Sequence, residues 1–242
     1  MGNGHRKKRK KGGWILIVAI LMMLSGVGVF TYPHIMQQLY EIEASRVIRD
    51  FDLRVEEYRA ASEDGSLRWL YLKMVEYNEE LYASNQNRLV DPWSYEQVSF
   101  SLTYFGFESE IIGYVTVPRM NIQLPIYLGA SHENLRKGAA HMTQTSLPVG
   151  GPNTNSVIAA HRGMSTAAMF RDIEWLQYGD EIIITNFYQT LRYEVVETKI
   201  IHPLDVGTIL IRSGNDMVTL LTCHPHRQNH QRYLVFATRI EE

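Results

Sequence analysis

Hydrophobic and polar positions divide this chain into three stretches with different patterns. The first, Trp14–Tyr32, is a run of nineteen consecutive residues without a charge. As a helix rising about 1.5 Å per residue, it is roughly 28 Å long, close to the hydrocarbon thickness of a bilayer. This pattern predicts a transmembrane helix over residues 14–32.

The second stretch has the period of a helix. From Met36 to about Asn87, apolar residues recur mostly at helix-compatible spacings, with charged residues between them. The polar break Ser62–Ser66 interrupts the run. We therefore expect a helical region over residues 33–88, folded as a hairpin that leads out of the membrane. A structural role, as a stalk and a packing surface, is sufficient to account for this region.

The third stretch consists of short segments rich in β-branched and aromatic residues, separated by Gly, Pro and Asn. One short helix is expected among them, at Thr166–Tyr178. This pattern predicts a mainly β fold over residues 107–242, a closed β-barrel with a β-sandwich as the alternative. The expected strands are Ile111–Val117, Pro125–Leu128, Ser156–Ala160, Glu181–Thr185, Leu191–Ile201, Met217–Thr222 and Tyr233–Ile240.

Charge is distributed unevenly along the chain. The formal net charge is -2, but six basic residues fill Arg6–Lys11, and the rest of the chain carries 18 basic against 26 acidic residues. A basic arm over residues 1–13 before an apolar segment predicts a cytoplasmic N-terminus and an exported remainder after Pro33. The acidic exported part argues against nucleic-acid binding.

The apolar segment has two other interpretations. A cleaved secretory signal is the alternative to an anchor, since Ser25, Gly26 and Gly28 supply small residues near a cleavage site. The segment is long for the apolar core of a signal, which favours the anchor. A buried core helix is disfavoured by the neighbouring basic run.

Cys223 is the single cysteine, so the chain forms no intramolecular disulfide. It closes the apolar strand Met217–Thr222 and therefore lies where a strand runs into a loop. A lone cysteine is most often a small buried hydrophobic residue. Here Arg227 and Arg232 follow within nine residues, and a hairpin would bring Arg232 beside the thiol, where a cation favours the nucleophilic thiolate.

A nucleophilic cysteine also needs a group that accepts and donates protons, usually an imidazole. His161 ends the apolar run Ser156–Ala160 and thus sits at another strand end, although an ordinary structural histidine is the alternative. His224, His226 and His230 compete with it because they are close to Cys223 in sequence.

These segments together resemble the sortase family. The resemblance rests on Thr219–Cys223 with Arg232 opening the next strand, on Ser156–Gly163, and on the stretch Gly138–Gly151. It covers roughly residues 107–240, which is the whole expected barrel.

The resemblance implies a cysteine transpeptidase that needs no cofactor. Cys223 would be the nucleophile, His161 the general acid and base, and Arg232 the group that stabilises the substrate carbonyl. A Leu-Pro-X-Thr-Gly-like sorting signal on a pilin or surface protein would be cleaved between Thr and Gly. The acyl group of the resulting thioester would then be transferred to a pilin lysine or to a cell-wall amine.

Asp91-Pro92-Trp93 points to a subclass. Alone it is a turn with an anchored aromatic residue. Before a sortase barrel, within a loop expected over residues 89–106, it resembles the lid of class C sortases, the pilin polymerases. That pattern implies that Asp91 pairs with Arg232 and that Trp93 covers the thiol, so the lid must move before substrate binds.

The chain departs from the class C pattern in two places. His224-Pro225-His226 stands where a Thr-Pro-Tyr-like sequence is usual, which affects substrate preference. Class C members often have a second hydrophobic segment after the barrel, whereas this sequence ends at Glu242 without one. Either the anchor is the N-terminal one alone, or the chain was truncated.

Other functions compete with pilus assembly. A housekeeping sortase that anchors proteins to the cell wall, or a non-enzymatic membrane-tethered assembly protein, would share most of these features. A metal site built from Cys223, His224, His226 and His230 is disfavoured, because adjacent Cys and His side chains do not readily point at one ion and no common zinc spacing is matched. A papain-like protease has the opposite order of cysteine and histidine.

Overall fold

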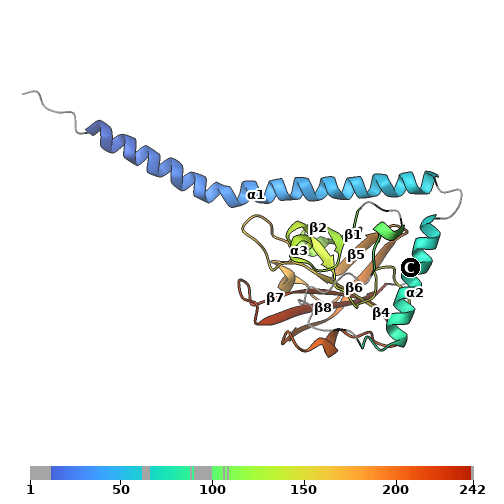
Figure 1. Ribbon diagram of the computed structural model, residues 1–242. Helices are drawn as coiled ribbons and strands as arrows, with labels where there is room; N and C mark the ends of the chain where they lie inside the picture. The colour runs from blue at the N-terminus through green and yellow to red at the C-terminus, as the bar shows by residue number, and fades with distance from the viewer. Residues whose placement is uncertain are drawn as a thin grey trace, which may run out of the picture.

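The structure is a computed structural model that describes residues 12–61, 66–87, 89, 100–105, 107 and 109–240. Two long helices, α1 (Gly12–Ala61) and α2 (Ser66–Ala83), precede a β-barrel (Figure 1). The strands are β1 (Ile111–Val117), β2 (Ile122–Leu128), β3 (Ala139–His141), β4 (Thr154–Ala159), β5 (Glu181–Asn186), β6 (Thr190–Ile201), β7 (Asp216–His224) and β8 (Gln231–Arg239).

The strands close into a barrel in the order β1-β2-β3-β4-β7-β8-β6-β5. Two pairs, β2 with β3 and β4 with β7, are parallel, and the others are antiparallel. The prediction of a closed barrel preceded by helices is confirmed, and the sandwich alternative is wrong.

Each of the seven expected strands is present, with ends shifted by up to three residues. The sequence did not indicate β3 or the short helix α3 (His132–Lys137). The helix expected at Thr166–Tyr178 is wrong, since only the 3-10 turn Ile173–Trp175 forms there. Met169 adopts a φ of 46°, and a left-handed residue cannot continue a right-handed helix.

Strands β4 and β7 are buried on both faces because the barrel wall has an apolar layer on each side. Inside, residues such as Ile112, Val115 and Ile158 belong to the main core, which also takes in side chains from α1 and α2. Outside, a second apolar cluster includes Val157 of β4, Leu221 of β7 and Ile209 from the segment after β6. Continuous apolar runs, rather than alternating ones, are typical of strands covered twice.

Helix α1 is continuous through Pro33, so the expected membrane segment and the first helix of the hairpin are one element. Its first half projects from the barrel and its second half runs along the barrel, with a bend between them (Figure 1). A proline removes one helical hydrogen bond and bends a helix. The docked half buries Ala44, Ile48, Phe51 and Val55, at spacings of four, three and four that keep one face toward the barrel.

The two halves of α1 have different surfaces. One helix of the described residues is long and apolar enough to cross a membrane, and its most apolar window has no buried residue. Beyond Pro33, polar contacts fix the helix to the barrel: Gln37 Oε1 accepts a hydrogen bond from the Ala168 backbone N–H at 2.6 Å, and Tyr40 donates to the Lys137 carbonyl at 3.2 Å.

Candidate active site

Cys223 and Arg232 face each other across the β7–β8 hairpin. The antiparallel register pairs Cys223 directly with Arg232, as the sequence predicted. The thiol-bearing residue is half-buried, and the Arg232 side chain is only 6% exposed. Arg232 Nη1 donates to the carbonyl oxygens of Asn229 at 2.6 Å and Gln231 at 3.1 Å, so the loop of the hairpin orients its guanidinium.

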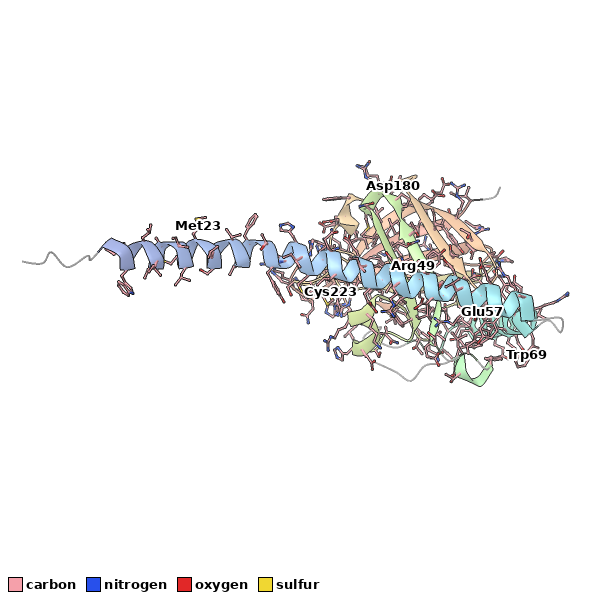
Figure 2. All side chains as sticks on the ribbon, turned by 90° about the horizontal axis from the view of Figure 1, so that it is seen from above. Met23, Arg49, Glu57, Trp69, Asp180 and Cys223 are labelled. Carbon is pink, nitrogen blue, oxygen red and sulfur yellow. The ribbon has the colours of Figure 1, made fainter. Side chains whose placement is uncertain are left out.

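His161 reaches the same end of the barrel through the parallel pairing of β4 with β7. The register runs to Ala159 opposite Leu221, and the Ala160 N–H then donates to the Leu221 carbonyl at 3.1 Å. Thr222 Oγ1 donates to the Ala160 carbonyl at 2.7 Å. These bonds fix the backbone beside His161 at the level of Cys223. Cys223 lies toward the end of the barrel from which the Met23 half of α1 projects (Figure 2).

Burial dominates the electrostatics of both groups. It raises the pKa of the Cys223 thiol above its ordinary value, while the charges of Arg232 and Arg162 oppose that rise without cancelling it. It also lowers the pKa of the His161 imidazole, and His132 lowers it further. The nearby cations thus favour the thiolate, as expected, but burial outweighs them. Both shifts favour the uncharged forms, a thiol and a neutral imidazole.

Arg162, which follows His161, has a place in the site that the sequence did not reveal. Its side chain is 6% exposed, and Nη1 donates to the Cys223 carbonyl at 3.4 Å, at the end of β7. Nη2 is 2.8 Å from Glu174 Oε1, Nε donates to the Arg171 carbonyl at 3.1 Å, and Nη1 lies 3.2 Å from His224 Nδ1. The guanidinium thereby ties the end of the histidine strand to the end of the cysteine strand.

The three histidines that follow Cys223 have different surroundings. His224 Nδ1 faces Glu174 Oε1 at 3.1 Å as well as Arg162, and His226 Nδ1 is 2.8 Å from the Arg162 carbonyl oxygen. His230 is exposed in the hairpin loop. Within the described residues, no group of three or more His, Cys, Asp or Glu side chains is arranged to hold a metal ion.

The one signal that could have found Arg162 is an arginine directly after a histidine at a strand end. Its partner Glu174 lies in a loop that folds back over the strand end, and no spacing rule predicts that loop. The proposed lid residues Asp91, Pro92 and Trp93 lie outside the described residues.

Comparison with known proteins identifies the family. The protein-family model for the sortase domain matches residues 115–240 of the sequence. A sortase C of Streptococcus pneumoniae, whose structure was described in terms of catalysis and pilin substrate specificity, superposes with a TM-score of 0.71 at 33% identity, covering 81% of this chain and 97% of that one. A lid mutant of Streptococcus agalactiae sortase C1 gives 0.70 at 32% identity, covering 81% and 97%.

The chain therefore belongs to the sortase family, whose members are cysteine transpeptidases, and the solved structures that it resembles include class C sortases. Among curated proteins, sortase D of Bacillus subtilis is 28% identical over 131 residues, which is 53% of this chain. The chain spans 63% of the length of that relative.

Proposed function

We propose that this protein is a membrane-anchored class C sortase that joins pilin subunits. The observation that carries the proposal is the meeting of three strand ends: β7 and β8 pair Cys223 with Arg232, and β4 brings His161 to the same level. A sulfur, an imidazole and a guanidinium at one end of the barrel are the groups that acyl transfer requires.

The chemistry begins from the uncharged pair. As Cys223 Sγ attacks the carbonyl carbon between Thr and Gly of a Leu-Pro-X-Thr-Gly-like signal, the thiol proton passes to His161. Arg232 donates to the oxygen that becomes negative, and its charge persists at any working pH. His161 then gives its proton to the glycine amine as the C–N bond breaks, leaving a thioester.

The second half-reaction returns the enzyme to its resting state. A lysine amine of another pilin attacks the thioester carbonyl, His161 accepts a proton from that amine, and the departing sulfur recovers its proton. The product is an isopeptide bond between two subunits. A cell-wall amine as acceptor would instead make the protein a housekeeping sortase.

The uniformly apolar half of α1, residues 14–32, supports anchorage in the cell membrane with the basic arm in the cytoplasm and the barrel outside. Resistance of the full chain to alkaline carbonate extraction tests the anchor. Labelling of intact cells with a membrane-impermeant maleimide tests orientation, because Cys223 is the single thiol and would be reached only from outside.

Transfer assays test the reaction itself. Synthetic peptides carrying Leu-Pro-X-Thr-Gly, with X varied, are incubated with the full-length protein in detergent, and thioester and products are identified by mass spectrometry. Acceptors with a lysine side-chain amine are compared with glycine amines. A preference for the glycine amines would refute the pilin assignment.

Matched variants assign the roles. Cys223→Ala abolishes transfer, and His161→Ala lowers it by roughly 10²–10⁴, whereas His224→Ala retains most activity. An equal loss at His224 and His161 would contradict the choice of base. If no peptide forms a thioester on Cys223, even in the Asp91→Ala and Trp93→Ala variants, the result would favour a non-enzymatic assembly protein.

The lid over Cys223 has a separate test. A solved lid mutant of Streptococcus agalactiae sortase C1 is among the similar structures. If Trp93 covers the thiol here, Trp93→Ala makes Cys223 react faster with a soluble thiol reagent, and Asp91→Ala does the same by releasing Arg232. An unchanged rate in both variants would remove the lid from this proposal.

A further inference from the structure

A cavity of about 590 Å³ opens beside the proposed active site, where α1 meets the barrel. Its wall comprises three parts that are distant in sequence: Pro33 of α1, the segment Gly163–Ser165 with Arg171, and His226 with Arg227 after β7. Two of these parts directly follow the strand ends that carry His161 and Cys223. The cavity therefore lies next to the site without including its three proposed reactive residues.

The charge of this cavity is positive. Arg171, Arg227 and His226 all contribute to the lining and are exposed, and the described residues that line it include no carboxylate. Arg171 Nη2 donates to the Met164 carbonyl at 3.1 Å, which holds one guanidinium at the rim. A guanidinium group matches the geometry of phosphate oxygens. The two guanidinium groups would repel a lysine amine, so this cavity is unsuited to the acceptor substrate.

A second hollow, open to its surroundings, lies along one face of α1 alone. It is lined by Met22, Ser25, Gly26, Val29, Phe30, Pro33 and His34, its volume is about 800 Å³, and its exposed surface is mostly apolar. Pro33 lines both spaces, so the apolar hollow and the cationic cavity adjoin at the proline. The hollow lies beside the segment proposed to cross the bilayer, and the cavity lies just beyond it.

From these two spaces we infer that the protein binds an anionic phospholipid of the outer leaflet. The phosphate group lies between Arg171 and Arg227, and an acyl chain follows the hollow beside Gly26 and Phe30. The position of Pro33, one residue after the apolar run, sets the cavity at the depth of the headgroups. This inference depends on the proposed membrane anchorage, but not on the proposed transfer reaction.

Lipid binding is measured with the full-length protein in a non-ionic detergent. Phosphatidylglycerol and phosphatidylcholine with the same short acyl chains are titrated separately, and bound lipid is counted by native mass spectrometry. We expect phosphatidylglycerol to bind at least about tenfold more tightly, and the double variant Arg171→Gln/Arg227→Gln to lose that preference. Retention of the preference by this variant would overturn the inference.

A matched control separates the cavity from overall charge. Arg119→Gln/Arg192→Gln also removes two positive charges, and the β1, β5 and β6 registers put these residues at the opposite end of the barrel. This pair should bind both lipids like the wild type. Loss of the preference in the control would mean that net charge, and not the cavity, selects the lipid.

Two further variants keep the inference falsifiable if Arg171→Gln disturbs its loop. Arg227→Gln alone should weaken phosphatidylglycerol binding severalfold. Gly26→Leu should weaken both lipids and leave their ratio unchanged, because a Cβ there meets no atom within 4 Å and the longer side chain would enter the hollow. Unchanged lipid binding in both variants would exclude this site.

Competition experiments distinguish lipid from other ligands. Full displacement of phosphatidylglycerol by inorganic phosphate would identify a site for soluble anions, and displacement by a sorting-signal peptide would assign the cavity to substrate; either result overturns the inference. Cys223→Ala should bind lipid as tightly as the wild type. Peptide transfer and lipid binding are thus measured separately, so either proposal can fail without the other.

Discussion

The two sides of Cys223 present an arginine each, but they hold it in different ways. On the β4 side, Arg162 is joined to Glu174, to His224 and to the Arg171 carbonyl. On the β8 side, the Nη1 group of Arg232 donates to the carbonyl oxygens of Asn229 in the hairpin loop and of Gln231, the first residue of β8. Both side chains are 6% exposed, so burial does not distinguish them.

This difference indicates two roles for a cation near a nucleophile: it can position other groups, or it can contact the substrate. Arg162 connects two strand ends and a loop, which suits a group that positions others. Arg232 is the direct register partner of Cys223, which suits a group that meets the substrate carbonyl. Both lower the pKa of the thiol, with the larger effect from Arg232. We therefore expect substitutions of Arg232 to lower activity most, and substitutions of Arg162 to lower stability most.

The largest effect is expected on the β8 side. Arg232→Ala should lower kcat/KM for peptide transfer by roughly 10²–10³, the usual cost of removing one oxyanion donor. Arg232→Lys should recover only part of it, because an ammonium lacks the forked geometry of a guanidinium. Product formation followed by mass spectrometry measures both. Full recovery with lysine would mean that charge alone matters there.

On the β4 side, stability should suffer more than chemistry. Arg162→Ala leaves the Arg171 carbonyl and His224 without their buried donor, and we expect the free energy of unfolding to fall by about 2 kcal/mol. Urea denaturation of the full chain in detergent measures this, with Arg171→Ala as a neighbouring control. A loss of activity as large as that of Arg232→Ala, with unchanged stability, would abolish the distinction between the two sides.

The protonation of Cys223 provides a third comparison. Since burial keeps the thiol protonated near neutral pH, its alkylation rate should rise about tenfold per pH unit between roughly pH 7 and 9 and not level off near 7. Arg162→Gln and Arg232→Gln should each slow the reaction, Arg232→Gln more. A rate that is independent of pH in this range would indicate a resting thiolate instead.

The smallest effect concerns Glu174, whose carboxylate is 46% exposed. Its hydrogen bond to Arg162 is the main cause of a lowered pKa, so the pair stabilises the fold above the ordinary carboxyl value of 4.5 and ceases to do so as pH falls through the lower folded value. Glu174→Gln should cost about 0.5 kcal/mol at pH 7. The difference from wild type should vanish in acid; persistence there would assign it to packing.

Much of this architecture was readable from the pattern of the chain. Apolar runs interrupted by Gly, Pro and Asn predicted the strands of the barrel wall, and a strand that ends at Cys223 followed by one that opens at Arg232 predicted their pairing. Such a hairpin is local, so its register depends on few residues. The parallel pairing of β4 with β7 joins segments some sixty residues apart. The resemblance to sortases, and not periodicity, linked His161 to Cys223.

The failures have local physical causes. Strand β3 is three residues long, too short for any period to be visible. The expected helix at Thr166–Tyr178 had suitable apolar spacing, but the chain turns at Met169 to bring Phe170 N–H to the His161 carbonyl at 3.1 Å. The continuity of α1 through Pro33 was missed because a proline usually marks a helix boundary.

A helix that runs without a joint from the apolar segment onto the barrel has a consequence for how substrates arrive. From Pro33 to Gln37, which accepts a hydrogen bond from the Ala168 backbone, the helix rises only about 6 Å. With the proposed anchor in the membrane, such a short connection would leave the barrel little freedom to search the space above the bilayer. Its partners would meet it by diffusing sideways in the same lipid sheet, so encounter rates would follow their surface density rather than their bulk concentration.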